Sequence, residues 1–108
     1  MYKRGTIVLV PFPFTDLSGQ KVRPAIIISN QPKSVDILVL FITTQVKNKF
    51  SFTVSVMPSD KNGLKSKSLV MCNKIATLDR SVILGQLEEI DKATLHEIEI
   101  EIKKVLGL

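Results

Sequence analysis

The feature that most constrains the fold is a change of hydrophobic period close to the C-terminal end of the chain. Up to residue 87 the apolar residues form short, β-branched runs separated by proline and polar residues, which is the pattern of strands and turns. From Asp91 onward they recur every three or four positions, as on one face of a helix. This order predicts a mainly β domain with a C-terminal α-helix, in which a small, curved partial barrel of antiparallel strands is capped by that helix.

The expected strands differ in how they bury their two faces. Residues 25–29 and 37–43 are continuous apolar runs, as expected for strands buried on both faces. Residues 50–56 alternate apolar side chains with Ser and Thr, which predicts a half-buried strand. Residues 6–10 form a β-branched run that two prolines follow, and prolines there end a strand or mark an edge. Further short strands or connectors are expected at residues 69–71, 74–78 and 82–86, with a polar loop at 15–21 and a turn at 59–63.

The C-terminal segment carries start and stop signals of a helix. Asp91 is the expected N-cap and Gly107 the expected end, with two lysines in the last turn. The expected apolar stripe consists of Leu95, Ile98, Ile102, Val105 and Leu106.

Bulk properties indicate one domain over residues 1–108, with a core supported by 44% hydrophobic residues. No apolar run reaches the roughly 20 residues of a membrane-spanning helix. The single cysteine, Cys72, excludes an internal disulfide, so we expect it to be a core residue of a cytoplasmic protein.

The net charge of +5 is unevenly distributed along the chain. Residues 1–80 contain 12 lysines and arginines and 4 acidic residues, whereas residues 81–108 contain 3 and 6. Two interpretations remain open on charge alone: an ordinary solvated surface with an acidic helix, or a basic face for a polyanion with the acidic segment turned away.

The residues available for chemistry are few. One histidine, His96, and one cysteine do not make a zinc site, and the four acidic residues before position 81 are widely scattered. We therefore expect neither a metal nor another cofactor. RNA cleavage suits this inventory, because the 2′-OH beside each phosphodiester is the nucleophile and an arginine can stabilise the charged phosphorane.

Arg23 and Thr43 are the best candidates for such a site. Pro24 forces Arg23 into extended backbone at the mouth of a strand. If the two buried runs form a hairpin centred near Lys33, Ala25 opposes Phe41, Ile27 opposes Val39, and Arg23 opposes Thr43 with β-carbons about 5 Å apart. On the residues alone, an alternative is that Arg23 forms a surface ion pair with Asp16 and that Thr43 is only a good strand former.

Several motifs strongly resemble the MazF/PemK family of toxin endoribonucleases. They are Arg4–Gly5 with the following strand and Pro11–Phe12–Pro13–Phe14, then Val22–Arg23–Pro24, Ile42–Thr43–Thr44–Gln45, and residues 74–80. The resemblance implies a CcdB/PemK-type, SH3-like partial barrel acting as a homodimeric toxin with a cognate antitoxin. It also implies cleavage of single-stranded RNA to 2′,3′-cyclic phosphate and 5′-OH ends, with Arg23 and Thr43 as the key residues. Residues expected to line the RNA groove are Thr15, Asp16, Ser18, Gln20, Lys21, Gln45, Lys47 and Lys74.

Two other functions remain possible on the same fold. One is a non-catalytic toxin that poisons gyrase, although those relatives rely on a tryptophan near the C-terminus and this chain contains none. The other is a degenerate RNA-binding regulator. Thr6, Lys74 and Ala76 depart from the residues common in the family, so the cleavage motif cannot be carried over.

Overall fold

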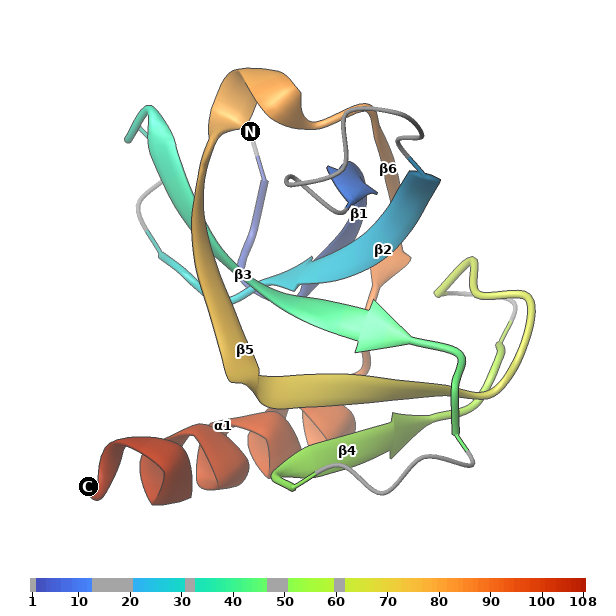
Figure 1. Ribbon diagram of the computed structural model, residues 1–108, viewed down its shortest axis with the longest axis vertical. Coiled ribbons are helices and arrows are strands. Elements are labelled where there is room, and N and C mark those ends of the chain that lie inside the picture. Colours follow the sequence, from blue (N-terminus) through green and yellow to red (C-terminus); the bar gives the residue numbers. More distant parts are fainter. Residues whose placement is uncertain (1, 13–20, 31–32, 47–50, 60–61) are drawn as a thin grey trace.

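The computed structural model of the protein describes residues 2–12, 21–30, 33–46, 51–59 and 62–108. In these residues an antiparallel six-stranded sheet, in the order β4-β5-β3-β2-β1-β6, curls into an open half-barrel that α1 covers on one side (Figure 1). The predicted fold class is therefore confirmed. The elements are β1 (Thr6–Phe12), β2 (Lys21–Ile27), β3 (Asp36–Thr43), β4 (Thr53–Val56), β5 (Ser68–Asp79), the 3₁₀ helix η1 (Arg80–Val82), β6 (Gly85–Glu89) and α1 (Lys92–Leu106).

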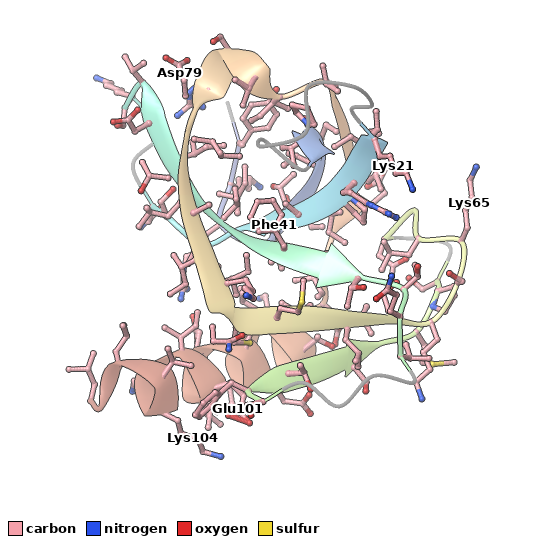
Figure 2. The ribbon with its side chains drawn as sticks, in the orientation of Figure 1. Lys21, Phe41, Lys65, Asp79, Glu101 and Lys104 are labelled. Atoms are coloured by element: carbon pink, nitrogen blue, oxygen red, sulfur yellow. The ribbon has the colours of Figure 1, made fainter. Side chains whose placement is uncertain are left out.

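The sheet buries apolar side chains on both faces, which is why its central strands read as continuous apolar runs. One cluster lies between the sheet and α1 and includes Ile26, Leu40 and the fully buried Ile98. The other fills the hollow of the half-barrel and includes Ala25, Ile27, Val39 and Phe41. Figure 2 shows Phe41 pointing into that hollow. Neighbouring residues of β2 and β3 thus alternate between the two cores.

The two strands expected at residues 69–71 and 74–78 are one long strand, β5. It runs past β3 in two segments with an irregularity between them: Leu40 pairs with Ile75, but Ile42 pairs with Val70. More residues of β5 than of β3 lie between these pairs, so β5 turns a corner there (Figure 1). Cys72 lies at this corner and is fully buried, as predicted for a core residue.

Pro11, which was expected to end a strand or mark an edge, and Pro24, which was expected at the start of a strand, both lie inside paired strands. Pro11 pairs with Val22 and Pro24 with Leu9, so β1 reaches Phe12 and β2 begins at Lys21. Both prolines are tolerated because the described ladders flank them on one side: β6 pairs with β1 only as far as Leu9, and β3 pairs with β2 only from Ala25. On the side where no described strand is paired, the missing proline N–H therefore removes no hydrogen bond between strands.

Two other strand predictions need correction. Phe52 has a positive φ of 59° and is 40% exposed, so the alternating strand begins only at Thr53, while Phe50 lies outside the described residues. The segment 82–86 is split between η1 and β6, because the Asp79 side chain accepts a hydrogen bond from the Ser81 N–H and starts a helical turn.

The helix begins and ends as predicted. The Asp91 side chain accepts from the Thr94 N–H, and Gly107 ends α1 in the left-handed conformation at φ 72°. Leu95 and Ile102 pack beside Ile98, but Leu106 is 56% exposed and does not belong to the buried stripe. No helix in the described part of the chain is long and apolar enough to cross a membrane.

Candidate active site

The register of the β2–β3 hairpin agrees with the sequence prediction. Ala25 pairs with Phe41 and Ile27 with Val39. Beyond these pairs, the Ile28 N–H donates to the Leu38 carbonyl at 2.9 Å in the same register. The observed pairing therefore sets the direction and offset of the two strands that carry Arg23 and Thr43.

Arg23 and Thr43 lie at the same end of this hairpin, each two residues beyond the last described pair, Ala25–Phe41. They are held by different outer neighbours: Arg23 pairs with Val10 of β1, and Thr43 pairs with Leu69 of β5. Both residues are half-buried. The described pairing of β2 with β3 stops before it reaches these two residues, so their direct opposition and their joint role in a site stay predictions.

Local bonding organises the Thr43 hydroxyl. Its Oγ1 accepts a hydrogen bond from the backbone N–H of Gln45 at 3.1 Å, which turns the chain immediately after β3. A hydroxyl that accepts in this way keeps its own O–H for donation. Thr43 can therefore donate to a phosphate oxygen or align a ligand hydroxyl.

Three of the predicted groove residues lie in the described part of the chain. Lys21 is the exposed first residue of β2, and Gln45 is exposed after the end of β3. Lys74 lies at the corner of β5, next to the Leu40–Ile75 pair and further along β5 than the position opposite Thr43. The remaining predicted residues lie outside the described residues: Thr15, Asp16, Ser18, Gln20 and Lys47.

Two further lysines, which were not predicted from the sequence, come just before the residue of β5 that pairs with Thr43. Lys65 and Lys67 are exposed and immediately precede β5, whose second residue, Leu69, pairs with Thr43. Figure 2 shows Lys65 and Lys21 projecting outward on the same side of the molecule. The dense lysine spacing in residues 61–67 was the available signal, but its relevance depends on the β3–β5 pairing.

Arg80 holds the opposite end of the hairpin. Its Nε and Nη2 donate to the Ser34 carbonyl at 3.0 and 2.8 Å, and its backbone N–H donates to the Val35 carbonyl at 2.7 Å. The guanidinium also lies over the Tyr2 ring, 5.7 Å from its centroid. These contacts tie the end of β5 to the segment before β3, so Arg80 supports the register on which the candidate site depends.

Comparisons with known proteins identify the family. The sequence profile of the PemK-like, MazF-like toxins of type II toxin–antitoxin systems matches residues 3–106. No curated protein matches the chain.

Similar solved structures support the fold. An endoribonuclease in complex with its cognate antitoxin from a mycobacterial species has a TM-score of 0.78 at 23% identity, covering 100% of this chain and 97% of that chain. A MazE–MazF complex from Deinococcus radiodurans has a TM-score of 0.80 at 23% identity, covering 99% and 96%. The Mycobacterium tuberculosis toxin MazF-mt6 has a TM-score of 0.75 at 23% identity, covering 95% and 97%.

The profile spans nearly all of the sequence, and the half-barrel with its C-terminal helix resembles these structures over almost their whole length. The chain therefore belongs to the PemK-like, MazF-like toxins of type II toxin–antitoxin systems.

Proposed function

We propose that this toxin is a metal-independent endoribonuclease that cleaves single-stranded RNA, messenger RNA in particular, at specific sequences. The observation that carries the proposal is the β2–β3 register, because it assigns Arg23 and Thr43 to the same end of one hairpin. The relatives named above as endoribonucleases or MazF toxins support the same activity. The exposed Lys21 and Lys65 lie on the same side of the molecule (Figure 2), and a basic surface there is suited to a polyanion.

The proposed reaction uses the substrate's own nucleophile. The ribose 2′-OH attacks the adjacent phosphorus in line, the bond to the 5′-oxygen breaks, and the products are a 2′,3′-cyclic phosphate and a 5′-OH. Arg23 donates two parallel hydrogen bonds to the phosphorane oxygens and stabilises their charge. Charge stabilisation, rather than proton transfer, is the role that we propose for Arg23. Thr43 orients the 2′-OH or a phosphate oxygen.

The test is a cleavage assay with a defined RNA and a matched RNA that carries one 2′-deoxyribose on the 5′ side of the cut. We expect cleavage of the first substrate to continue in excess EDTA and the second to stay intact at that position. Cleavage at the deoxy position would identify water or a protein group as the nucleophile and would overturn the mechanism. Sequencing the 5′ ends of the products gives the cleavage motif.

The proposed partner is a cognate antitoxin with an acidic segment that folds on binding. Two of the similar structures are complexes of a toxin with its antitoxin, which supports this assignment. An acidic segment with a few apolar anchors suits the basic β2 side of the molecule and would compete there with RNA. We expect the antitoxin peptide to displace a non-cleavable RNA, more rapidly at low salt than at high salt. Simultaneous binding of both ligands would contradict the shared site.

The proposed assembly is a cytoplasmic homodimer. Apolar side chains that this chain leaves exposed on the α1 side of the sheet support it: Leu38 and Ile75 are diagonal neighbours on β3 and β5 and are 39% and 38% exposed. Sedimentation of the purified toxin across a range of concentrations tests the dimer.

A further inference from the structure

The two free edges of the sheet meet across one cleft. The sheet begins at β4 and ends at β6, so in the described part of the chain each of these strands has a strand partner on one side only. Ser55 and Val56 of β4 and Gln86, Leu87 and Glu88 of β6 line the same cleft of about 1140 Å³, which the start of α1 closes from below. This cleft is the unclosed seam of the half-barrel. None of the predicted RNA-site residues that the structure describes lines it.

One end of the seam is closed by packing. Asn62 folds the chain after β4 into a turn: its Oδ1 accepts from the Ser59 and Leu64 N–H groups, and its Nδ2 donates to the Met57 carbonyl. This turn lets Gly63, at φ 73°, approach the side chain of Leu87 so closely that a β-carbon would lie 3.1 Å from it. The turn thereby lies between β4 and β6, which do not pair with each other, and the seam stays open beside the turn.

The charge of the seam is uniformly negative among its described lining residues, which include Glu88, Glu89, Asp91 and Glu97. Two of these carboxylates are engaged: Glu89 lies 3.7 Å from Lys3, and Asp91 caps α1. Glu88 and Glu97 are exposed and have no ion pair among the described residues. Two charges on the wall of the seam are therefore free to meet a cation.

We propose that the seam docks an extended lysine- or arginine-rich segment of a partner polypeptide, which adds as a strand to the free edge of β6. An edge strand offers a row of unpaired N–H and C=O groups to an incoming strand, and the free carboxylates of Glu88 and Glu97 favour a cationic one. A nucleic acid is disfavoured because it is itself a polyanion. The described lining of the seam does not include Arg23 or Thr43, and the proposed partner has the opposite charge to the proposed antitoxin segment.

A blocked eight-residue peptide that alternates lysine and threonine is the probe, and the same peptide with glutamate in place of lysine is its control. We expect the lysine peptide to slow hydrogen exchange of the backbone amides in Gly85–Glu89, and the glutamate peptide to leave them unchanged. Glu88→Gln should weaken binding roughly two- to five-fold, as expected for the loss of one exposed ion pair.

Asp36→Asn is the matched control variant, because Asp36 is an exposed carboxylate at the start of β3 that does not line the seam. It should bind the lysine peptide as the unmodified toxin does. Equal losses in Glu88→Gln and Asp36→Asn, or protection outside β6, would refute the proposal. A change of oligomeric state in Glu88→Gln without peptide would show that a second copy occupies the seam, which also refutes it. Binding is measured without RNA, so the result does not depend on cleavage activity.

Discussion

The open end of the β2–β3 hairpin and the helix α1 show two different ways in which this chain positions side chains. The helix is determined by residues of its own segment: Asp91 caps its first turn, Gly107 ends it, and two lysines occupy its last turn. At the hairpin end, Arg23 is paired with Val10 of β1, and Thr43 with Leu69 of β5. The proposed chemistry thus depends on long-range pairing, whereas the helix is a locally specified cover for the core. Changes in the two regions should separate activity from stability.

The largest expected effect comes from the hairpin end. Arg23→Ala should reduce the rate of RNA cleavage by about 1,000-fold, because it removes the group that stabilises the phosphorane. The free energy of unfolding should change by no more than about 0.5 kcal/mol, since Arg23 is only half-buried and is not one of the buried core residues. Single-turnover cleavage and urea unfolding of the same preparation measure both quantities.

Arg23→Lys is the matched control for geometry. It should restore little activity, because an ammonium group cannot form the two parallel hydrogen bonds of a guanidinium. A rate for Arg23→Ala within a few-fold of the unmodified toxin would remove Arg23 from the mechanism.

A substitution in the helix should have the opposite effect and lower stability without lowering activity. Ile98→Ala should lower the free energy of unfolding by about 2–5 kcal/mol, because Ile98 is fully buried between α1 and the sheet. Cleavage per folded molecule should be preserved. Ile100→Ala is the control on the same helix, since Ile100 is 44% exposed, and it should change stability by less than about 1 kcal/mol. Loss of activity in folded Ile98→Ala would show that the two regions are coupled.

The pH dependence of stability in alkaline solution tests the burial of Cys72 in the core beneath the helix. Burial raises the pKa of the Cys72 thiol to about 11, and the Glu101 carboxylate adds to this shift. The folded state therefore holds its proton more tightly than the unfolded state, whose thiol has a pKa of 9.0, so this contribution is complete below pH 9.0 and declines as pH rises toward 11. Unfolding free energies of the unmodified toxin and Cys72→Ala should converge over this range. Parallel curves would exclude Cys72 as the titrating group.

The smallest effect is expected at the helix cap. Asp91→Ala should lower the free energy of unfolding by about 1 kcal/mol because it removes the acceptor for the Thr94 N–H. The hydrogen bond from the Thr94 side chain holds the pKa of Asp91 below its ordinary value of 3.8. The ionised cap therefore stabilises the fold above pH 3.8, and this contribution is lost as pH falls through the lowered pKa. Asp91→Asn, which can still cap, should lack that acid dependence in urea titrations.

Predictions from the sequence succeeded where the determining contacts are local or follow a simple rule. The cap and end of α1 depend on Asp91 and Gly107 themselves. The β2–β3 register followed from placing the centre of one connection near Lys33, because an antiparallel pairing then assigns every opposed pair. The roles of Arg23 and Thr43 were suggested by this register and by a family resemblance, and they await the experiments above.

The corner in β5, the continuation of β1 through Pro11 and the meeting of β4 with β6 could not be predicted from the sequence. Each feature depends on which strand lies alongside. The corner in β5 occurs where its pairing with β3 is irregular. Pro11 is tolerated because β6 pairs with β1 only as far as Leu9. By itself, the sequence determined the mainly β fold and the helix, because hydrophobic period and capping are properties of short segments. Only the tertiary structure decided the acidic seam, because it is lined by segments far apart in the chain that meet when the sheet curls.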